Sequence, residues 1–244
     1  MSDAQMAIKI NDLRVDHGKG RGLLGIDLAL PPGSVTALLG RNGSGKSTLI
    51  DACLGLFPRA SGKMSVLGFD PRRNGPEVRQ ALGYVEADPH FENQLTTRQL
   101  MRWRARLHPT WSDERAQTLL DQFEIPKDAR CGELSRGQRT CLALACALAH
   151  QPKLLLLDEP FDGLDVGRRH EILAGIIRFV EGDRAVLIAT HDLDEVERIA
   201  DRVVMIAKGR TILQDPIEKI YADDKRLEES FLELTKTPRE VSPC

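Results

Sequence analysis

The chain has 244 residues, of which 41% are hydrophobic and 29% are charged, and its formal net charge is −2. This balance is typical of one folded domain with a packed core, and it excludes a disordered chain. It also argues against nucleic acid as a partner, because proteins that bind along nucleic acid carry a large positive excess.

The first fifth of the chain is predicted to contain short strands. Ile8-Lys9-Ile10 and Leu28–Leu30 have strand character, and the glycine-rich segment Gly18–Gly22 between them has turn composition. The apolar run Val35–Leu39 is predicted to be a buried strand that leads through a glycine-rich loop into a helix from about Lys46 to Leu56.

The stretch from about residue 95 to 150 is expected to be mostly helical, with separate helices at Arg98–Leu107 and Asp113–Phe123. Two later runs, Leu154–Leu157 and Ala185–Ala189, are fully apolar, as strands of a parallel sheet covered on both faces should be.

The last part of the chain carries a hairpin signal. Val203–Ile206 and Thr211–Gln214 flank Lys208-Gly209, and Leu227–Leu234 reads as a short amphipathic helix. The sequence therefore predicts an α/β fold with a mostly parallel sheet. We expect a single domain over residues 1–235, with a helical subdomain at about 95–150, and a flexible tail over 236–244.

The five cysteines form no C-x-x-C pair, and their number is odd. We therefore expect a reduced chain whose cysteines act as small buried hydrophobic residues. The start of the chain has no basic-then-apolar leader, and the longest apolar runs fall far short of about 18 residues, the length that suggests a membrane span. Any work at a membrane is expected to need a partner chain.

A phosphate-binding motif, G-x-x-x-x-G-K-[ST], lies between the predicted strand and helix. It comprises Gly40, Arg41, Asn42, Gly43, Ser44, Gly45, Lys46 and Ser47. Its glycines let successive backbone N–H groups point inward, and together with the helix N-terminus these groups can bind the α- and β-phosphates of a nucleotide. Lys46 adds a positive charge near the β- and γ-phosphates, Ser47 offers a hydroxyl to Mg²⁺, and Thr48 can contact the phosphates further.

Two carboxylates follow the apolar strand Leu154–Leu157. Asp158 is expected at the carboxyl edge of the sheet beside the phosphate loop, where it can hold Mg²⁺ directly or through water. Glu159, as the next strand residue, is expected to point to the opposite face and to accept a proton from the water that attacks the γ-phosphorus.

A capped helix start lies between these two motifs. In Leu134-Ser135-Arg136-Gly137-Gln138, Ser135 and Gln138 satisfy the capping box S-x-x-[EQ] ahead of a long apolar helix. In this position the segment resembles the signature sequence of ABC ATPases, and the resemblance covers roughly residues 8–235. It implies a P-loop NTPase core, an N-terminal antiparallel β subdomain and a helical subdomain that carries the signature.

The resemblance also implies that two copies pair head to tail. The signature of one copy, here Ser135, Arg136, Gly137 and Gln138, would then face the γ-phosphate held by the other copy. Asp165 in Gly163-Leu164-Asp165 matches the D-loop near the dimer seam. His191 matches the switch histidine, which touches the γ-phosphate and the attacking water.

Two positions depart from the family pattern. His17 stands where the family usually has an aromatic residue that stacks on adenine; an imidazole can stack less well, and His17 also fits a simple turn. In Leu82–Pro89, which resembles the Q-loop, Ala87 stands where glutamine joins the Mg²⁺ shell. We expect a water to fill that position, with Glu86 and Asp88 turned toward the helical subdomain or a membrane partner; Glu86 as the ligand is the alternative.

The function that the resemblance implies is Mg-ATP hydrolysis by the energising subunit of an ABC transporter. Its partners would be a second cassette and a separate integral membrane permease, with the chain cytoplasmic and peripheral on the inner face of the cell membrane. The segment around Trp111 looks like that of single-cassette subunits of ABC-2-type transporters. The alternatives are a soluble ABC ATPase, such as a cluster-assembly subunit, and a nucleotide-binding regulator without turnover.

Overall fold

The structure, a computed structural model, describes residues 6–18 and 21–222. Its strands form one mixed sheet in the order β4-β1-β2-β9-β8-β3-β7-β6-β5. The strands are β1 (Ile8–Asp16), β2 (Gly22–Leu30), β3 (Val35–Leu39), β4 (Ser61–Val66), β5 (Leu82–Val85), β6 (Leu154–Asp158), β7 (Ala185–Thr190), β8 (Arg202–Ala207) and β9 (Arg210–Pro216). The helix expected at Leu227–Leu234 and the expected tail lie outside the described residues.

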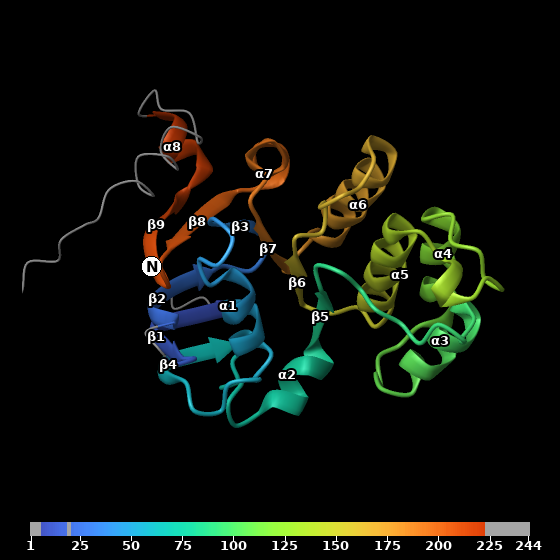
Figure 1. Ribbon diagram of the computed structural model, residues 1–244, viewed down its shortest axis with the longest axis horizontal. Helices are drawn as coiled ribbons and strands as arrows, with labels where there is room; N and C mark the ends of the chain where they lie inside the picture. Colours follow the sequence, from blue (N-terminus) through green and yellow to red (C-terminus); the bar gives the residue numbers. More distant parts are fainter. Residues whose placement is uncertain (1–5, 19–20, 223–244) are drawn as a thin grey trace, which may run out of the picture.

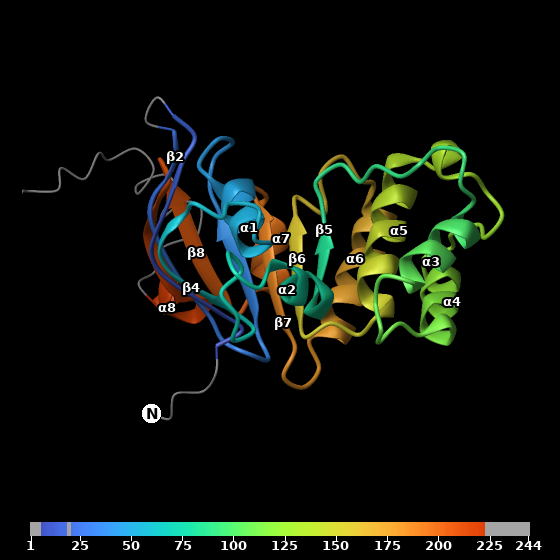
Figure 2. The ribbon, with the colours of Figure 1, turned by 90° about the horizontal axis from the view of Figure 1, so that it is seen from below.

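Eight α-helices and one 3₁₀ turn lie between or after these strands within the described ranges. They are α1 (Lys46–Cys53), α2 (Gly75–Ala81), α3 (Thr97–Ala105), α4 (Asp113–Gln122), η1 (Cys131–Glu133), α5 (Arg136–Ala149), α6 (Val166–Phe179), α7 (Leu193–Ile199) and α8 (Ile217–Ala222). Figure 2 shows β2, β4 and β8 at one end of the molecule, then β7, β6 and β5, and then the helices α3 to α6.

The first strands form an antiparallel layer, as expected for the N-terminal β subdomain. β1 pairs antiparallel with both β2 and β4, whereas β2 reaches the rest of the sheet through one parallel pair, Gly25 with Arg210 of β9. Helix α1 packs between this layer and the central strands (Figure 1), and its side chains Leu49 and Ile50 are fully buried.

The central strands β3, β5, β6, β7 and β8 are mutually parallel, which confirms the α/β architecture. Every residue of β3, β6 and β7 is buried. In β6, Leu155 and Leu157 belong to the apolar cluster with α5 and α6, while Leu154 and Leu156 belong to the cluster with α1. Helices therefore cover both faces, which is why these strands carry no polar alternation.

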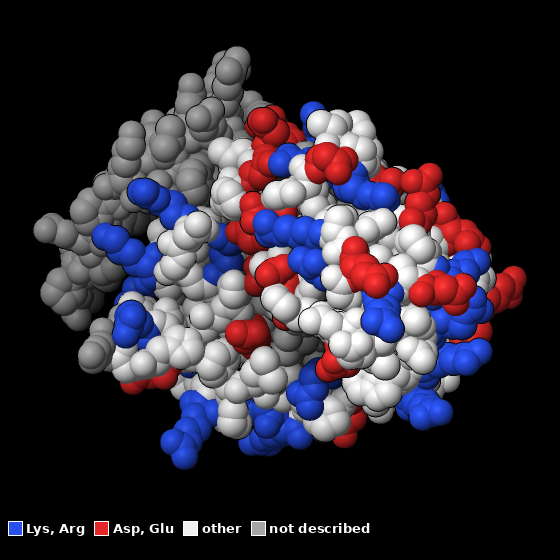
Figure 3. Space-filling model, turned by 45° about the vertical axis from the view of Figure 1, so that its right-hand side comes forward, with Lys and Arg blue, Asp and Glu red and all other residues white. Residues whose placement is uncertain are grey.

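The helical subdomain consists mainly of α3, α4 and α5. Ten consecutive residues of α5, from Thr140 to Ala149, are buried, since α4, α6 and the sheet surround this helix. Basic and acidic side chains are interspersed over the face of the molecule that Figure 3 draws.

Two turn positions explain where elements end. The helix expected from Lys46 to Leu56 ends at Cys53, because Gly55 adopts φ +79° and Leu56 N donates to Asp51 O, the backbone pattern that closes a helix with a left-handed glycine. In the β8–β9 hairpin, Lys208 and Gly209 both have positive φ, as a tight two-residue turn requires. The hairpin prediction is confirmed.

The four described cysteines, Cys53, Cys131, Cys141 and Cys146, are free and buried. Across the part of the chain that the structure describes, no helix combines the length and the apolarity that a bilayer crossing demands.

Candidate functional site

The phosphate loop follows β3 directly and continues into the first two residues of α1, Lys46 and Ser47. Gly43 and Gly45 have φ of +78° and +115°, conformations that residues with a Cβ rarely adopt. A Cβ on Gly40 would lie 2.3 Å from Ser44 Oγ, so the loop closes too tightly for a side chain there. The loop thus leaves α1 without a side-chain cap, and its first N–H groups remain available to an anion.

Lys46 extends from the start of α1 back across the loop. Its side chain is 6% exposed, and Nζ donates to Gly40 O at 2.7 Å and lies 3.1 Å from Glu159 Oε1. A buried ammonium group needs such partners to offset its lost hydration. The charge is therefore held at the mouth of the loop, beside the end of β6.

Asp158 is the last residue of β6 and is only 4% exposed. Burial raises the pKa of its carboxyl group, and a hydrogen bond with the Ser47 side chain opposes that rise. Its Oδ1 atom is buried and has no hydrogen-bond partner among the described residues. A buried carboxylate oxygen without a partner, beside a serine hydroxyl, is a donor set that suits a hard cation such as Mg²⁺.

β6 ends at Asp158, and Glu159 lies beyond it. The expectation that strand alternation separates the side chains of Glu159 and Asp158 is therefore wrong. Its φ is +45°, and its N–H donates to Ala189 O of β7 at 2.8 Å. This left-handed turn separates its side chain from that of Asp158 and brings it to Lys46. A strained backbone at a non-glycine residue is typical of functional positions.

His191 follows β7 and meets Glu159 at the same sheet edge. Its Nδ1 lies 2.9 Å from Glu159 Oε2, and its backbone N–H donates to the same oxygen at 3.3 Å. Glu159 is therefore held on one oxygen by Lys46 and on the other by His191. The two sequence-predicted catalytic candidates, which are 32 residues apart, are in direct contact.

Lys46, Asp158 and Glu159 line a pocket of about 780 Å³, and His191 contacts Glu159 from outside that lining. The lining includes Arg41, Asn42, Gly43, Gly45, Lys46, Ser47 and Thr48 of the loop, together with Asp158, Glu159 and the hairpin turn Lys208-Gly209. His17 lies at the pocket as well, with its ring packed edge-on against Phe57 at 5.1 Å between centroids. Most of the residues expected to bind a nucleotide thus converge on one volume.

Ala87 also lines this pocket, whereas its neighbour Glu86 does not. Glu86 lines a different hollow, and its Oε1 accepts a hydrogen bond from His90 N at 3.3 Å. Asp88 faces the start of α5, where its Oδ1 lies 3.9 Å from Arg139 Nη2. The side chain that reaches the phosphate side of this loop is therefore a methyl group.

The signature segment lies apart from the pocket. The capping box is present: Ser135 accepts from Gln138 N, and Gln138 accepts from Ser135 N. Asp165 caps α6 by accepting from Arg168 N. Among the described residues that line the nucleotide pocket, none belongs to 135–138, and Asp165 is not one of them.

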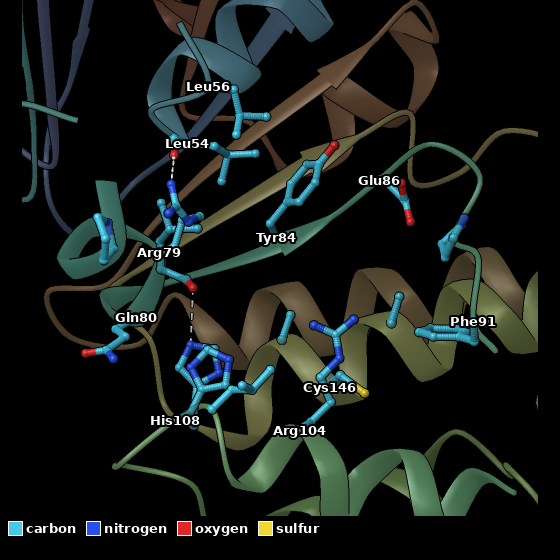
Figure 4. Close-up of a pocket in the computed structure, with 17 residues that line it drawn as sticks. Leu54, Leu56, Arg79, Gln80, Tyr84, Glu86, Phe91, Arg104, His108 and Cys146 are labelled. Atoms are coloured by element: carbon cyan, nitrogen blue, oxygen red, sulfur yellow. Dashed lines mark hydrogen bonds between the residues drawn. The ribbon is translucent and has the colours of Figure 1, made fainter. Parts of the chain in front are cut away.

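The hollow that Glu86 lines is a second feature, and sequence reasoning missed it. We name it the subdomain groove; it has about 500 Å³ and lies between the α1–α2–β5 region and helices α3 and α5 (Figure 4). Its lining is largely apolar and includes Leu56 and Leu107, which are 54% and 44% exposed. Five separate elements contribute to it, so no local sequence pattern marks it.

Two histidines stack in the lining of the subdomain groove. The rings of His108 and His150 are 4.0 Å apart between centroids, and His150 Nε2 lies 3.2 Å from Leu82 O at the start of β5. Burial, with the neighbouring His108 charge second, lowers the pKa of His150 to about 4. Burial also lowers the pKa of His108. The pair is therefore neutral near pH 7.

Comparison with known proteins identifies the chain. A family model described as ABC transporter matches residues 23–162, which include the phosphate loop, the signature and the acidic strand end. The chain belongs to the ABC transporter family. ABC ATP-binding proteins are ATPases, and this chain is one of that class. A second model, described as an AAA domain, matches residues 130–197.

Curated relatives with different named roles share this cassette. The chain is 33% identical over 242 residues to the daunorubicin resistance ATP-binding protein DrrA2 of Streptomyces coeruleorubidus, covering 96% of this chain and 75% of that protein. It is 39% identical over 209 residues to the molybdenum import ATP-binding protein ModC of Aromatoleum aromaticum, covering 82% of this chain and 55% of that protein.

A solved ATP-binding subunit of an ABC transporter has the same fold. It superposes with a TM-score of 0.86 at 26% identity and covers 94% of this chain and all of that chain.

Proposed function

We propose that the chain binds and hydrolyses Mg-ATP as the energising subunit of a transporter, pairs head to tail with a second cassette and couples to a separate membrane subunit. The observation that carries the proposal is Glu159, which is held between Lys46 and His191 at the edge of the phosphate-loop pocket. A carboxylate placed beside the phosphate lysine and hydrogen-bonded to a histidine has the arrangement of a general base.

The phosphate loop supplies the binding step. The free N–H groups at the start of α1 and the Nζ of Lys46 face the region where the phosphates would lie. In the structure Glu159 balances the charge of Lys46. When phosphates take over that balance, Glu159 is released toward water, with His191 still bound to its other oxygen.

The residues present also fit Mg²⁺. Ser47 and Asp158 would hold it, since the buried Oδ1 of Asp158 has no protein partner and the Ser47 hydroxyl lies beside this carboxylate. Mg²⁺ prefers oxygen ligands, and in such sites it usually takes only one or two from the protein. When bound, the ion neutralises charge on the β- and γ-phosphates.

Proton transfer falls to Glu159. Its backbone turn fixes the carboxylate at the sheet edge, and the His191 contact orients it. A carboxylate in this place accepts the proton of the attacking water, and His191 Nδ1 stabilises its orientation.

Head-to-tail pairing is supported by the signature being outside the pocket of its own chain. Ser135 caps α5 at an exposed surface, so the N-terminus of this helix is open to another molecule. A second copy would bring Ser135, Arg136, Gly137 and Gln138 to the γ-phosphate. Helix N-termini carry about half a positive unit charge, which suits that role.

The subdomain groove supports the proposal that the chain binds a membrane partner. Exposed apolar side chains such as Leu56 and Leu107 favour an apolar segment of another chain, and the groove begins next to Glu86 and Ala87. We propose that the groove takes a cytoplasmic segment of an integral membrane subunit, which makes the chain peripheral on the inner face of the membrane. The ABC-2-type branch remains our interpretation of the segment around Trp111.

The pairing is tested with the variant Glu159→Gln, which retains the shape of the side chain but not the base. We expect Mg-ATP to convert this protein from monomer to dimer, measured by sedimentation velocity, with two nucleotides per dimer. Glu181→Gln, an exposed change before β7, is the matched control and should not accumulate dimers. A monomer at saturating Mg-ATP would contradict self-pairing.

The membrane partner is tested by affinity capture from detergent-solubilised membranes. We expect an integral membrane protein to co-purify, and Leu107→Ser to reduce its recovery, because this change removes an exposed apolar contact in the groove. Phe69→Ser is the control, since Phe69 is equally exposed at 42% and does not line the groove. Capture of a soluble assembly complex alone would instead favour the cluster-assembly alternative.

A further inference from the structure

The first turn of α5 places a cation where the helix itself disfavours one. Arg136 is the first residue of α5, and this turn contains no acidic residue. Because the N-terminus of a helix is the positive end of its dipole, acidic residues are the stabilising choice there. Arg136 therefore adds positive charge to an end that already attracts anions.

Asp162 of the same chain supplies the compensating anion. Its Oδ2 accepts a hydrogen bond from Arg136 Nη2 at 2.8 Å, with the two side chains 50% and 39% exposed. The guanidinium also lies against Gly163, where an added Cβ would come within 2.5 Å of Arg136 Nη1. The backbone after β6 is thus fitted around this arginine.

The segment that holds Arg136 is the same turn that carries the catalytic candidate. Asp162 N donates to Glu159 O at 3.2 Å, so Asp162 and Glu159 belong to one tight turn. An ion pair therefore joins the signature of a chain, which would act on the nucleotide of the other copy, to the turn that carries its own general base.

A neighbouring arginine, Arg139, is less free to change partners than Arg136. Arg139, one turn further along α5, donates to the backbone carbonyl of Leu134 at 2.9 Å. Its carboxylate neighbour, Asp88, is 3.9 Å away. In the first turn, Arg136 is the arginine whose closest partner is another exposed side chain, which can rotate away without leaving a buried group unpaired.

We propose that Asp162 is a positioning residue that competes with the nucleotide for Arg136. Asp162 of the same chain binds Arg136 while the cassettes are apart, and the terminal phosphate of the nucleotide on the second copy replaces it when they pair. This rests on the head-to-tail pairing proposed above. Asp162 accepts one hydrogen bond from Arg136, through Nη2. A terminal phosphate carries more charge than a carboxylate and can accept two such bonds from the guanidinium, so it displaces Asp162 when ATP is present.

The exchange has a consequence for the opposite site. When Arg136 of one chain binds the nucleotide held by the second copy, Asp162 of the first chain is released. Its release loosens the turn that carries Glu159 of that first chain. A nucleotide bound to one copy therefore frees the general base of the other copy. Asp162 would thereby set how much ATP is needed before two cassettes close.

The test uses Glu159→Gln protein as the parent and measures the Mg-ATP concentration that gives half-maximal dimer by sedimentation velocity. In this background Asp162→Asn should lower that concentration by about two- to fivefold, the range for loss of an exposed ion pair. Arg136→Gln should raise it by about tenfold or more, the effect of losing a charge-assisted hydrogen bond to a phosphate. In the double variant Asp162→Asn should have no further effect.

A matched ion pair provides the control. Arg98 in α3 binds Asp128 through two hydrogen bonds on an exposed surface of the same subdomain. Arg98→Gln and Asp128→Asn should leave the half-maximal concentration unchanged. Melting temperatures and the affinity of each monomer for ATP show that the variants are folded and that their own phosphate loops are intact.

The outcomes separate this inference from the proposed function. If the Glu159→Gln parent stays monomeric in saturating Mg-ATP, self-pairing fails and the inference fails with it. If the parent dimerises but Asp162→Asn and Arg136→Gln both raise the ATP requirement, the pair is merely structural and the inference alone is overturned. The same holds if neither change has an effect. Opposite shifts that disappear in the double variant support the exchange.

Discussion

The phosphate-loop pocket and the signature differ in how complete they are within one chain. In the pocket, residues of the phosphate loop, the start of α1, the end of β6 and the β8–β9 turn reach one volume. Glu159 in its lining is held by Lys46 and by His191. At the start of α5, Ser135 and Gln138 satisfy only the helix end, and Arg136 relies on an exposed carboxylate.

This difference shows where an intramolecular site ends and an intermolecular one begins. Side chains that face a substrate in their own chain are held by buried strands. Side chains that would face a substrate on another chain are held by a cap and a surface ion pair, which cost little to rearrange. Substitutions in the two regions should therefore differ in the size of their effects and in the property that they change.

The largest expected effect is on turnover in the complete site. Glu159→Gln removes the proton acceptor while retaining the contacts that an amide can make, so hydrolysis should fall by about 10²–10⁴-fold while ATP still binds. Phosphate release measures the rate, and Glu181→Gln is the control. A variant that hydrolyses ATP at the wild-type rate would remove Glu159 from the reaction.

The next effect concerns binding in the same pocket. Lys46→Ala deletes the charge at the mouth of the loop, so ATP affinity should drop by roughly 10- to 100-fold, the worth of a charge-assisted hydrogen bond. Calorimetry checks this. Lys153→Ala is the matched control, because Lys153 is exposed at the opposite end of β6. Equal affinities for both variants would mean that the phosphate loop is misread.

A smaller effect is expected outside both regions, in the stacked histidines. The pKa of His150 is lowered to about 4 in the folded chain, against an ordinary value of 6.5, so the unfolded chain binds the proton first. Stability from this group is complete above pH 6.5 and is lost as the pH falls toward 4, by on the order of 2 kcal/mol between pH 7 and pH 5.

His150→Gln should flatten this dependence, because glutamine can still donate to Leu82 O but does not titrate. The free energy of unfolding in urea at pH 7 and pH 5 measures it. His170→Gln, at an exposed position of α6, should keep the wild-type pH dependence. A pH dependence in His150→Gln as steep as in the wild type would assign the acid sensitivity to other groups.

The smallest effect should come from Glu86→Ala. Glu86 faces the subdomain groove while Ala87 faces the phosphates, so a water is expected to complete the Mg²⁺ shell, and the basal ATPase of the isolated chain should change by less than about twofold. Titration of Mg²⁺ against activity checks this, with Asp158→Ala as the variant that should raise the requirement. A large rise in Glu86→Ala would make Glu86 a metal-shell residue.

The sequence predicted the elements whose pattern is local. β3 matches its predicted range because Val35–Leu39 is an uninterrupted apolar run, and α5 begins where Ser135 and Gln138 form a capping box. The positions of Lys46, Asp158 and His191 followed from strand ends that meet at one sheet edge. In each case the sequence pattern lies within a few residues of the side chain whose position it predicts.

Features that depend on tertiary packing were not predictable in this way. No helix is predicted from the sequence at α6, because Gly167 and Gly175 weaken its pattern. Gly175 allows close packing of Phe123, whose Cζ lies 3.3 Å from where a Cβ would be. The left-handed turn at Glu159 and the subdomain groove likewise arise from contacts between distant segments. The roles of His17 and Asp165 stay predictions.

The junction between β2 and β9 has a thermodynamic consequence. One register pair, Gly25 with Arg210, and the hydrogen bond from Leu24 N to Gly209 O join β2 to β9 there. Further along the two strands, Asp27 N donates to Thr211 Oγ1 and Ala29 N donates to Gln214 Oε1. The nucleotide pocket extends across this junction, since Gly22 and Leu24 line it together with Lys46 and Gly209. A ligand bound at that place stabilises the native state by mass action and adds contacts on both sides of the junction. Bound ATP would thus stabilise the contact between the two parts of the sheet in addition to being the substrate for hydrolysis.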